Sequence, residues 1–277
     1  MATSLRDLLR VTPGAPVDLD ELDARATPHA PGGKKKTAAG MAAEGDRLAG
    51  LQEALYAASA RRILLVLQGM DTSGKGGVIE HVIGLVNPQG VHIHSFKKPT
   101  PDELRHHFLW RVRRALPDPG MIGIFDRSHY EDVLVGRVHA LAAPEIVEKR
   151  YDEINKFEAG LVENGYALVK CFLNVSYDEQ RERLLSRLTD PTKNWKFNPG
   201  DLAERARWTD YQQAYRIALE RCSTPQAPWY AVPADRKWYR NWAVGRLLLE
   251  TVRDLDPQYP QPELDVPALT KALAPPN

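Results

Sequence analysis

The chain contains 277 residues, of which 43% are hydrophobic, so it can bury the core of one large domain or of two small ones. Its 37 basic and 36 acidic residues nearly balance, which argues against a nucleic-acid partner and requires that local clusters of charge meet any anionic ligand. Two cysteines cannot build a disulfide framework, and with neither a signal peptide nor an apolar run of about 20 residues we expect a cytoplasmic protein without a membrane partner.

Residues 1–50 are predicted to form a peripheral N-terminal extension with a basic loop and the start of a helix. Leu5, Leu8 and Leu9 could share one helical turn, but prolines interrupt the segment that follows. The run Lys34, Lys35 and Lys36 follows two glycines. It is either a solvated loop or a contact for a polyanion. An amphipathic helix is expected over residues 41–60.

The stretch 63–77, ILLVLQGMDTSGKGG, joins an apolar run to a glycine loop and a helix. The apolar run predicts a strand buried on both faces, and the loop has the spacing of a phosphate-binding P-loop. Backbone N–H groups and the helix N-terminus, with about half a positive charge, favour a phosphate there, and Lys75 can reach the outer phosphates. The residues expected to bind nucleotide phosphate are Gly69, Met70, Thr72, Ser73, Gly74, Lys75, Gly76 and Gly77.

One position departs from the usual P-loop. Gly76 stands where a Ser or Thr hydroxyl normally binds Mg²⁺, while the loop contains Asp71. We therefore expect the Asp71 carboxylate to take over the metal role. The alternative interpretation is a glycine-rich turn that merely connects a strand to a helix.

The next segment is predicted to hold a strand and a helix. Residues 91–96 alternate apolar and polar side chains, as in a strand, and His92 and His94 are interpreted as ordinary strand residues. Thr100 to Glu103 has the pattern of a capping box with proline at the first helical position. A helix is therefore expected from there to about residue 116, with Leu104 facing inward.

A second chemical centre lies at MIGIFDRSHYED, residues 121–132. A buried strand delivers Asp126 at its carboxyl end, where ligands bind in open α/β sheets, so Asp126 has the form of a Walker B acid that holds Mg²⁺. The alternative is a helix N-cap. Arg127 could clamp a phosphoryl oxygen, and Glu131 could be a second acid. His129 is interpreted as structural.

The following segments continue the alternation of helices and strands. A helix is expected over residues 144–164 and a buried strand over 167–175, with a last strand at 229–232 and a helix at 236–252. This alternation predicts an α/β fold, a parallel sheet with helices on both faces. From residue 256 the prolines predict an extended tail, which leaves residues 51–255 as the main domain.

Residues 181–216 are predicted to form a lid, with helices at 177–188 and 201–221 joined by a basic loop. A lid brings cations over a transferring phosphoryl group and excludes water. The candidate anion-binding residues are Arg183, Arg187, Lys193 and Lys196. The alternative is that the two arginines simply pair with local acids such as Glu179 or Glu182.

Four motifs together resemble the polyphosphate kinase 2 family over roughly residues 30–250: LQGMDTSGKGG (67–77), FDRSHYEDVLV (125–135), RLLSRLTDPTKNWKF (183–197) and APWYAVPADRKWYRNW (227–242). The resemblance implies a P-loop kinase-like three-layer fold with a helical lid, which moves phosphoryl groups between inorganic polyphosphate and nucleotides with Mg²⁺. It also implies a dimer or tetramer. With Glu131 in this motif, the chain is similar to the group of the family that accepts AMP as well as ADP. At position 76, in contrast, it has Gly where many members have Asp.

These residues suggest direct in-line transfer, with Asp71 and Asp126 holding Mg²⁺ (Mn²⁺ being the alternative). The expected catalytic residues are Asp71, Lys75, Asp126, Arg127, Glu131, Arg183 and Arg187, and those expected to bind polyphosphate are Lys34, Lys35, Lys36, Arg127, Lys193 and Lys196. Two alternatives stay open: an ATP-dependent nucleoside monophosphate kinase of the thymidylate kinase type, and a GTPase-like switch or non-catalytic polyphosphate- or nucleotide-binding module. The chain lacks the Asn-Lys-x-Asp guanine motif, which counts against the switch.

Overall fold

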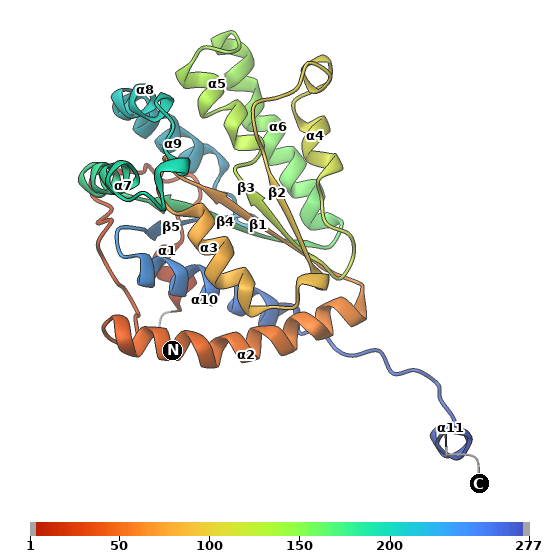
Figure 1. The fold of residues 1–277 in the computed structure, drawn as a ribbon. Coiled ribbons are helices and arrows are strands. Elements are labelled where there is room, and N and C mark those ends of the chain that lie inside the picture. The colour runs from red at the N-terminus through yellow and green to blue at the C-terminus, as the bar shows by residue number, and fades with distance from the viewer. Residues whose placement is uncertain (1–3, 274–277) are drawn as a thin grey trace.

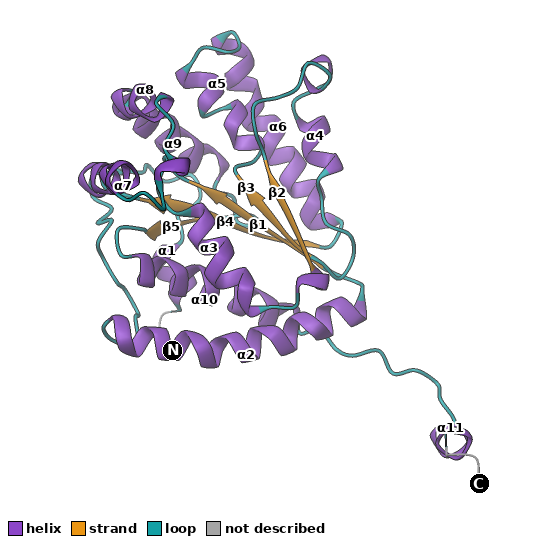
Figure 2. Cartoon of the chain, in the orientation of Figure 1, coloured by secondary structure: helices purple, strands orange, loops and turns teal. Residues whose placement is uncertain are grey.

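The computed structural model describes residues 4–273 and contains one sheet of five parallel strands in the order β2-β3-β1-β4-β5. Helices cover both faces of the sheet (Figures 1 and 2), as the sequence predicts. The strands are β1 Arg62–Gln68, β2 Val91–Ser95, β3 Ile122–Asp126, β4 Tyr166–Asn174 and β5 Trp229–Pro233. The helices are α1 Leu5–Leu9, α2 Lys34–Ala58, α3 Lys75–Val82, α4 Leu109–Arg114, α5 Val135–Val138, α6 Pro144–Glu163, α7 Tyr177–Thr189, α8 Gly200–Ala206, α9 Trp208–Cys222, α10 Lys237–Leu255 and α11 Val266–Ala272.

The order of the strands places the two chemical centres side by side. β1 is central, and its residues 63–67 are completely buried, as expected for a strand covered on both faces. β3 pairs with β1 so that Leu67 lies opposite Asp126. Because parallel strands end at the same edge of the sheet, the P-loop after β1 and the acid at the end of β3 meet there.

The helices form a layer on each face of the sheet, and on one face a further helix packs outside that layer. α3 and α10 pack on one face, and α2 packs outside α10, whereas α4, α6 and α9 cover the other face (Figure 1). Trp229 of β5 and Trp242 of α10 are buried between these layers and the sheet. None of the helices in the described part of the chain combines the length and the apolar character needed to cross a bilayer.

The N-terminal segment is less peripheral than predicted. Leu5 and Leu9 of α1 are buried, whereas Leu8 is exposed, and the Val11 N–H donates to the carbonyl of Trp229 on β5. The segment therefore covers an edge of the sheet that would otherwise expose unpaired backbone groups. The three lysines 34–36 lie in the first turn of α2, not in a loop, because the preceding Gly33 is the N-cap.

The prediction of one continuous helix over residues 100–116 is wrong, because the helix is interrupted between Arg105 and Leu109. Thr100 and Glu103 form the expected capping box, with Thr100 N donating to Glu103 Oε2 at 2.8 Å, but only one 3-10 turn follows. α4 begins separately at Leu109, whose N–H donates to the His107 ring at 3.3 Å. Leu104, in the 3-10 turn, is exposed instead of facing inward.

The lid and the tail also differ in detail. The predicted helix 201–221 is two helices, α8 and α9, because Arg207 between them leaves the helical conformation at φ −95° and ψ 23°. The tail extends away from the body as predicted (Figure 1), but it contains the short helix α11, whose residues are exposed.

Candidate active site

The P-loop is a tight turn that only glycine can make at two positions. Gly69 and Gly74 have φ values of +155° and +106°, in the region that L side chains avoid. A Cβ at Gly69 would also lie 2.8 Å from the Leu173 carbonyl oxygen. Lys75 Nζ donates to the Gly69 carbonyl at 2.9 Å and thus closes the loop. The glycines therefore allow the loop to fold back on itself around its lysine.

The loop holds polar groups that suit an anionic ligand. The hydroxyls of Thr72 and Ser73 are buried and have no hydrogen-bond partner among residues 4–273. Burial lowers the pKa of Lys75, although the nearby Asp71 opposes this effect. Unpartnered buried hydroxyls and a partly desolvated ammonium group are both stabilised by a bound phosphate.

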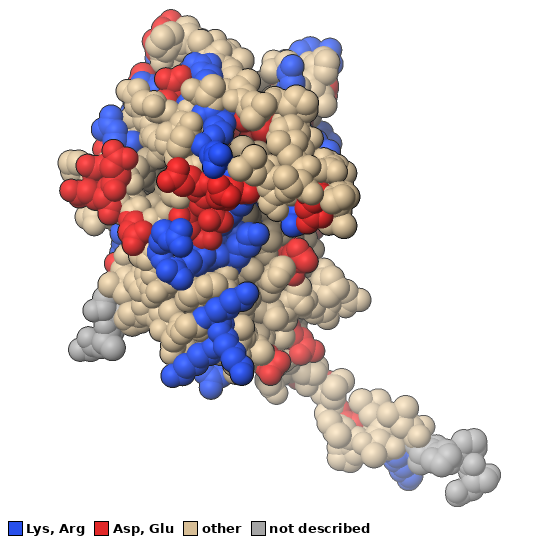
Figure 3. All heavy atoms as spheres, turned by 60° about the vertical axis from the view of Figure 1, so that its left-hand side comes forward, with Lys and Arg blue, Asp and Glu red and all other residues tan. Residues whose placement is uncertain are grey.

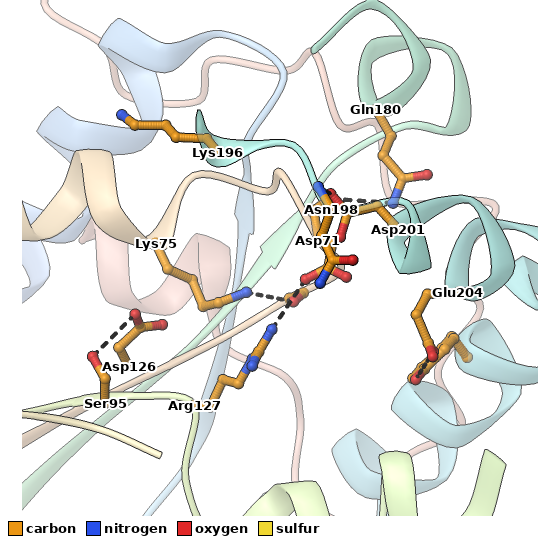
Figure 4. A network of polar contacts seen from close by, with 12 residues as sticks. Asp71, Lys75, Ser95, Asp126, Arg127, Gln180, Lys196, Asn198, Asp201 and Glu204 are labelled. Atoms are coloured by element: carbon orange, nitrogen blue, oxygen red, sulfur yellow. Dashed lines mark hydrogen bonds and ion pairs between the residues drawn. The ribbon is translucent and has the colours of Figure 1, made fainter. Parts of the chain in front are cut away.

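Asp126 and Arg127 reach the P-loop from the end of β3. The Ser95 hydroxyl donates to Asp126 Oδ2 at 3.4 Å. Arg127 has a left-handed backbone with φ +64°, and its N–H donates to the Leu67 carbonyl at 3.1 Å. This turn aims its guanidinium at the loop, where Nη2 lies 3.2 Å from Asp71 Oδ1 (Figure 4). A left-handed non-glycine residue costs about 1–3 kcal/mol, which is common at functional sites.

The carboxylates of this site fit a hard divalent cation bound partly by substrate. Residues 4–273 contain no cluster of three or more His, Cys, Asp or Glu side chains that could hold a metal alone. Mg²⁺ typically binds through one or two carboxylates and through substrate phosphates, without a complete protein cage. Asp71 and Asp126 both lie close enough to Lys75 to act on its charge, and they are the two carboxylates that could hold such an ion.

Glu131 lies on a 3-10 turn, His129–Asp132, which is held in place by contacts of His129 and Tyr130 with the buried Glu158. His129 is fully buried and lies 3.1 Å from Glu158 Oε1, so it has the environment of a structural residue. The same carboxylate accepts the Tyr130 hydroxyl at 2.8 Å. Glu131 itself is half-buried, and burial raises its pKa, although Arg127 and Lys75 oppose this shift.

The structure places Arg183 against the backbone of the P-loop and not on the side of the loop where a phosphate would bind. Its guanidinium is buried and donates to the Thr72 and Ser73 carbonyls at 2.9 and 3.1 Å. It also donates to the carbonyls of residues 234 and 235 and to Glu179 Oε1 at 2.9 Å. The pairing with Glu179, one of the alternatives raised by the sequence, is thus present, and Arg183 holds the loop's backbone in place.

The other lid cations pair within the lid. Arg187 donates to Asp201 Oδ2 at 3.1 Å, and Lys193 lies 2.6 Å from Asp190 Oδ2. Lys196 lies over the Trp195 ring at 5.0 Å, and its side chain points away from Asp71 (Figure 4). Figure 3 shows basic side chains gathered beside acidic ones on the face that carries the lid and the start of α2.

Sequence reasoning missed several residues that join the lid to the site. Gln180 Nε2 donates to the Asp71 carbonyl at 3.1 Å, and Asp201 lies near Asp71 (Figure 4). Burial and the negative charge of Asp71 raise the pKa of Asp201. Gln180 precedes Arg183 by three residues on α7, so its shared helical face was a usable signal. Arg240, whose Nη1 donates to the Ser73 carbonyl at 3.2 Å, lies in the motif at 227–242, but nothing in that motif indicates a contact with the P-loop.

Comparison with known proteins gives one consistent result. The family model described as Polyphosphate kinase 2 (PPK2) matches residues 33–260. The chain is 47% identical to an AMP/ADP-polyphosphate phosphotransferase of Meiothermus ruber over 92% of this chain and 95% of that protein. It is 44% identical to an ADP-polyphosphate phosphotransferase of Rhodopseudomonas palustris over 82% of each. A crystal structure of polyphosphate kinase 2 from Arthrobacter aurescens TC1 superposes with a TM-score of 0.94 at 47% identity, covering 98% of this chain and 97% of that one.

Proposed function

Because the chain belongs to the polyphosphate kinase 2 family, we propose that it transfers phosphoryl groups from inorganic polyphosphate to AMP and ADP, giving ADP and ATP. The observation that carries this proposal is the meeting of Lys75, Asp71 and Arg127 at the edge of the sheet beside Asp126. The names of the similar proteins supply the donor and the acceptors, and the site supplies the chemistry.

The transfer is direct and in line. Phosphoryl transfer depends on positioning and on neutralising charge spread over the equatorial oxygens, so a covalent intermediate is not required. The P-loop amides and Lys75 hold the acceptor's phosphate, and Arg127 neutralises the migrating group. Asp71 and Asp126 would hold Mg²⁺, or alternatively Mn²⁺, which would withdraw negative charge from the phosphate oxygens.

Polyphosphate is bound by clustered cations outside the P-loop. These cations are Lys193 and Lys196 on the lid, Arg127, and Lys34 to Lys36 at the start of α2. Arg187 instead orders the lid through its ion pair with Asp201. Arg183 contributes by holding the P-loop and not by touching the donor. The lid, joined to the loop through Gln180, excludes water and so suppresses hydrolysis.

Glu131 sets the acceptance of AMP as well as ADP, as its similarity to the AMP-accepting group of the family implies; it is half-buried, and the charges of Arg127 and Lys75 act on it. Replacing it with Asn should lower the ratio of AMP to ADP phosphorylation. A cytoplasmic location, where these nucleotides occur, and assembly into a dimer or tetramer belong to the same proposal.

The test is incubation of the purified protein with AMP, polyphosphate and Mg²⁺, followed by separation of nucleotides. ADP and then ATP should appear, and omission of polyphosphate should abolish both. If AMP were phosphorylated only when ATP was supplied, the protein would be a nucleoside monophosphate kinase of the thymidylate kinase type. Tight binding of polyphosphate and ADP with no product would instead indicate a non-catalytic binding module.

A further inference from the structure

Arg240 on α10 lies directly behind the P-loop. The residue is only 3% exposed, and its Nη1 donates to the Ser73 carbonyl at 3.2 Å. Nε and Nη2 both donate to Asn241 Oδ1, at 3.1 and 2.7 Å. The guanidinium is thus held rigidly, and one of its hydrogen bonds ends on the loop that receives phosphate.

Two glycines of the P-loop motif make room for this side chain. A Cβ at Gly74 would lie 1.6 Å from Arg240 Nη1, and a Cβ at Gly77 would lie 2.6 Å from Nη2. The first contact is sterically impossible, so any residue other than glycine at position 74 would displace the arginine. The guanidinium therefore lies against the backbone of the loop and of the first turn of α3.

The surroundings of Arg240 hold positive charge and no compensating acid. Within residues 4–273 no carboxylate forms an ion pair with Arg240, whereas Arg183 donates to the same Ser73 carbonyl. The N-terminus of α3 adds about half a positive charge. Burial, and then the charge of Arg183, lower the pKa of Arg240 to about 10.

A buried charge without a partner is costly, and proteins rarely keep one unless a ligand or metal compensates it. Arg183 has Glu179 at 2.9 Å, so only one of the two arginines is neutralised by the protein. The missing negative charge must come from the open side of the loop, where Lys75 and the unpartnered Thr72 and Ser73 hydroxyls lie.

We propose that Arg240 is a positioning residue whose fixed charge, together with its hydrogen bond to Ser73, prepares the P-loop for the phosphate of the acceptor nucleotide, and that this phosphate is its absent counter-ion. The proposal rests on the proposed function, since it concerns the same nucleotide site. It differs from a purely structural role, because the charge of Arg240 acts on ligand binding through the backbone of the loop.

The experiment compares ADP binding by the full-length wild type, Arg240→Met and Arg240→Lys, by calorimetry without polyphosphate at two ionic strengths. Arg246→Met is the matched control, because Arg246 lies on the same helix but pairs with Glu44 and Glu250 at 2.7 and 2.8 Å. Circular dichroism and thermal unfolding verify that each variant is folded.

Arg240→Met should bind ADP about tenfold more weakly, equivalent to about 1.4 kcal/mol. Arg240→Lys should stay within about threefold of the wild type, and Arg246→Met should bind normally. Unchanged affinity in Arg240→Met, or an equal loss in Arg240→Lys, would overturn the proposal. Polyphosphate-dependent turnover by the wild type is measured separately, so its absence would refute the proposed function while the binding comparison would still decide the role of Arg240.

Discussion

The Arg127 guanidinium lies 3.2 Å from the Asp71 carboxylate, and this contact joins the loop after β1 to the turn after β3. Both side chains are partly exposed, at 41% and 30%, so solvent screens the pair and it adds little to stability. Its consequence is geometric. It holds a guanidinium and a carboxylate at the same opening, where a donor and an acceptor phosphate can meet.

Asp71→Asn and Asp126→Asn should each lower kcat by about a hundredfold or more, because each removes a carboxylate that is proposed to hold the metal, and the metal would neutralise the transferring group. The Mg²⁺ concentration for half-maximal rate should rise in both. The measurement is initial rate against metal concentration. Asp118→Asn is the control, since Asp118 is exposed and precedes the opposite end of β3. Full activity in Asp126→Asn would contradict the assigned role.

The titration of Lys75 should limit activity at high pH. Burial lowers its pKa from the ordinary 10.5, so the ammonium group loses its proton at a lower pH than an exposed lysine would. We expect kcat/KM to fall on the alkaline side with a midpoint below 10.5, and kcat to fall at a higher pH, because bound phosphate favours the charged form.

The variant Lys75→Arg separates this effect from other titrations. A guanidinium has a pKa above about 12, so the residual activity of this variant should keep its rate to higher pH. Lys149→Arg, on the exposed face of α6, should leave the profile unchanged. An alkaline limb that is identical in Lys75→Arg and the wild type would show that another group titrates.

The lid lysines should act on polyphosphate and not on the nucleotide. Lys193→Ala combined with Lys196→Ala should raise the KM for polyphosphate several-fold and leave ADP affinity unchanged. The effect should shrink at high salt, because these exposed charges are screened. Lys149→Ala with Lys156→Ala on α6 removes the same charge elsewhere and should have no effect. An equal rise in the KM for ADP would contradict this assignment.

The sequence predicted both chemical centres because each is a local string with a fixed relation to a strand. The P-loop follows β1 and Asp126 ends β3, and the rule for parallel sheets brings the ends of these strands together. By contrast, Arg183 and Arg240 meet Ser73 across 110 and 167 positions of the chain. A long arginine can reach over the loop or under it, and only tertiary packing decides between the two.

The helix after Thr100 fails for a related reason. Its capping box forms as predicted, but a cap only starts a helix. Whether the helix continues depends on burying an apolar face, and Leu104 finds no core to pack against.

The turn that carries Glu131 depends on an ion pair buried beneath it. Lys170 Nζ lies 2.5 Å from Glu158 Oε2, and both side chains are almost completely buried. Lys170 also donates to the Tyr130 hydroxyl at 2.9 Å and to the Cys222 carbonyl at 2.7 Å. Glu158 in turn holds His129 and Tyr130, so the ion pair fixes both residues that precede Glu131.

Lys170→Met should therefore destabilise the protein by about 3–5 kcal/mol, because it leaves the Glu158 carboxylate buried with one partner fewer. The double variant Lys170→Met with Glu158→Gln removes both charges and should recover part of that loss, which urea unfolding of the single and double variants will measure. Additive losses would show that the two groups do not act as a pair.

The pair also gives the wild type a specific acid sensitivity. Burial by itself raises the pKa of Glu158, but Lys170 and His129 outweigh it and hold the pKa below its ordinary 4.5. A carboxyl group with a lowered folded-state pKa stabilises the protein above its unfolded pKa, and this contribution is lost as the pH falls through the folded value. Below pH 4.5 the free energy of unfolding of the wild type should therefore fall more steeply as the pH is lowered. The double variant, which has no carboxylate at position 158, should show a weaker dependence over the same range, and an identical slope in both proteins would contradict the assignment.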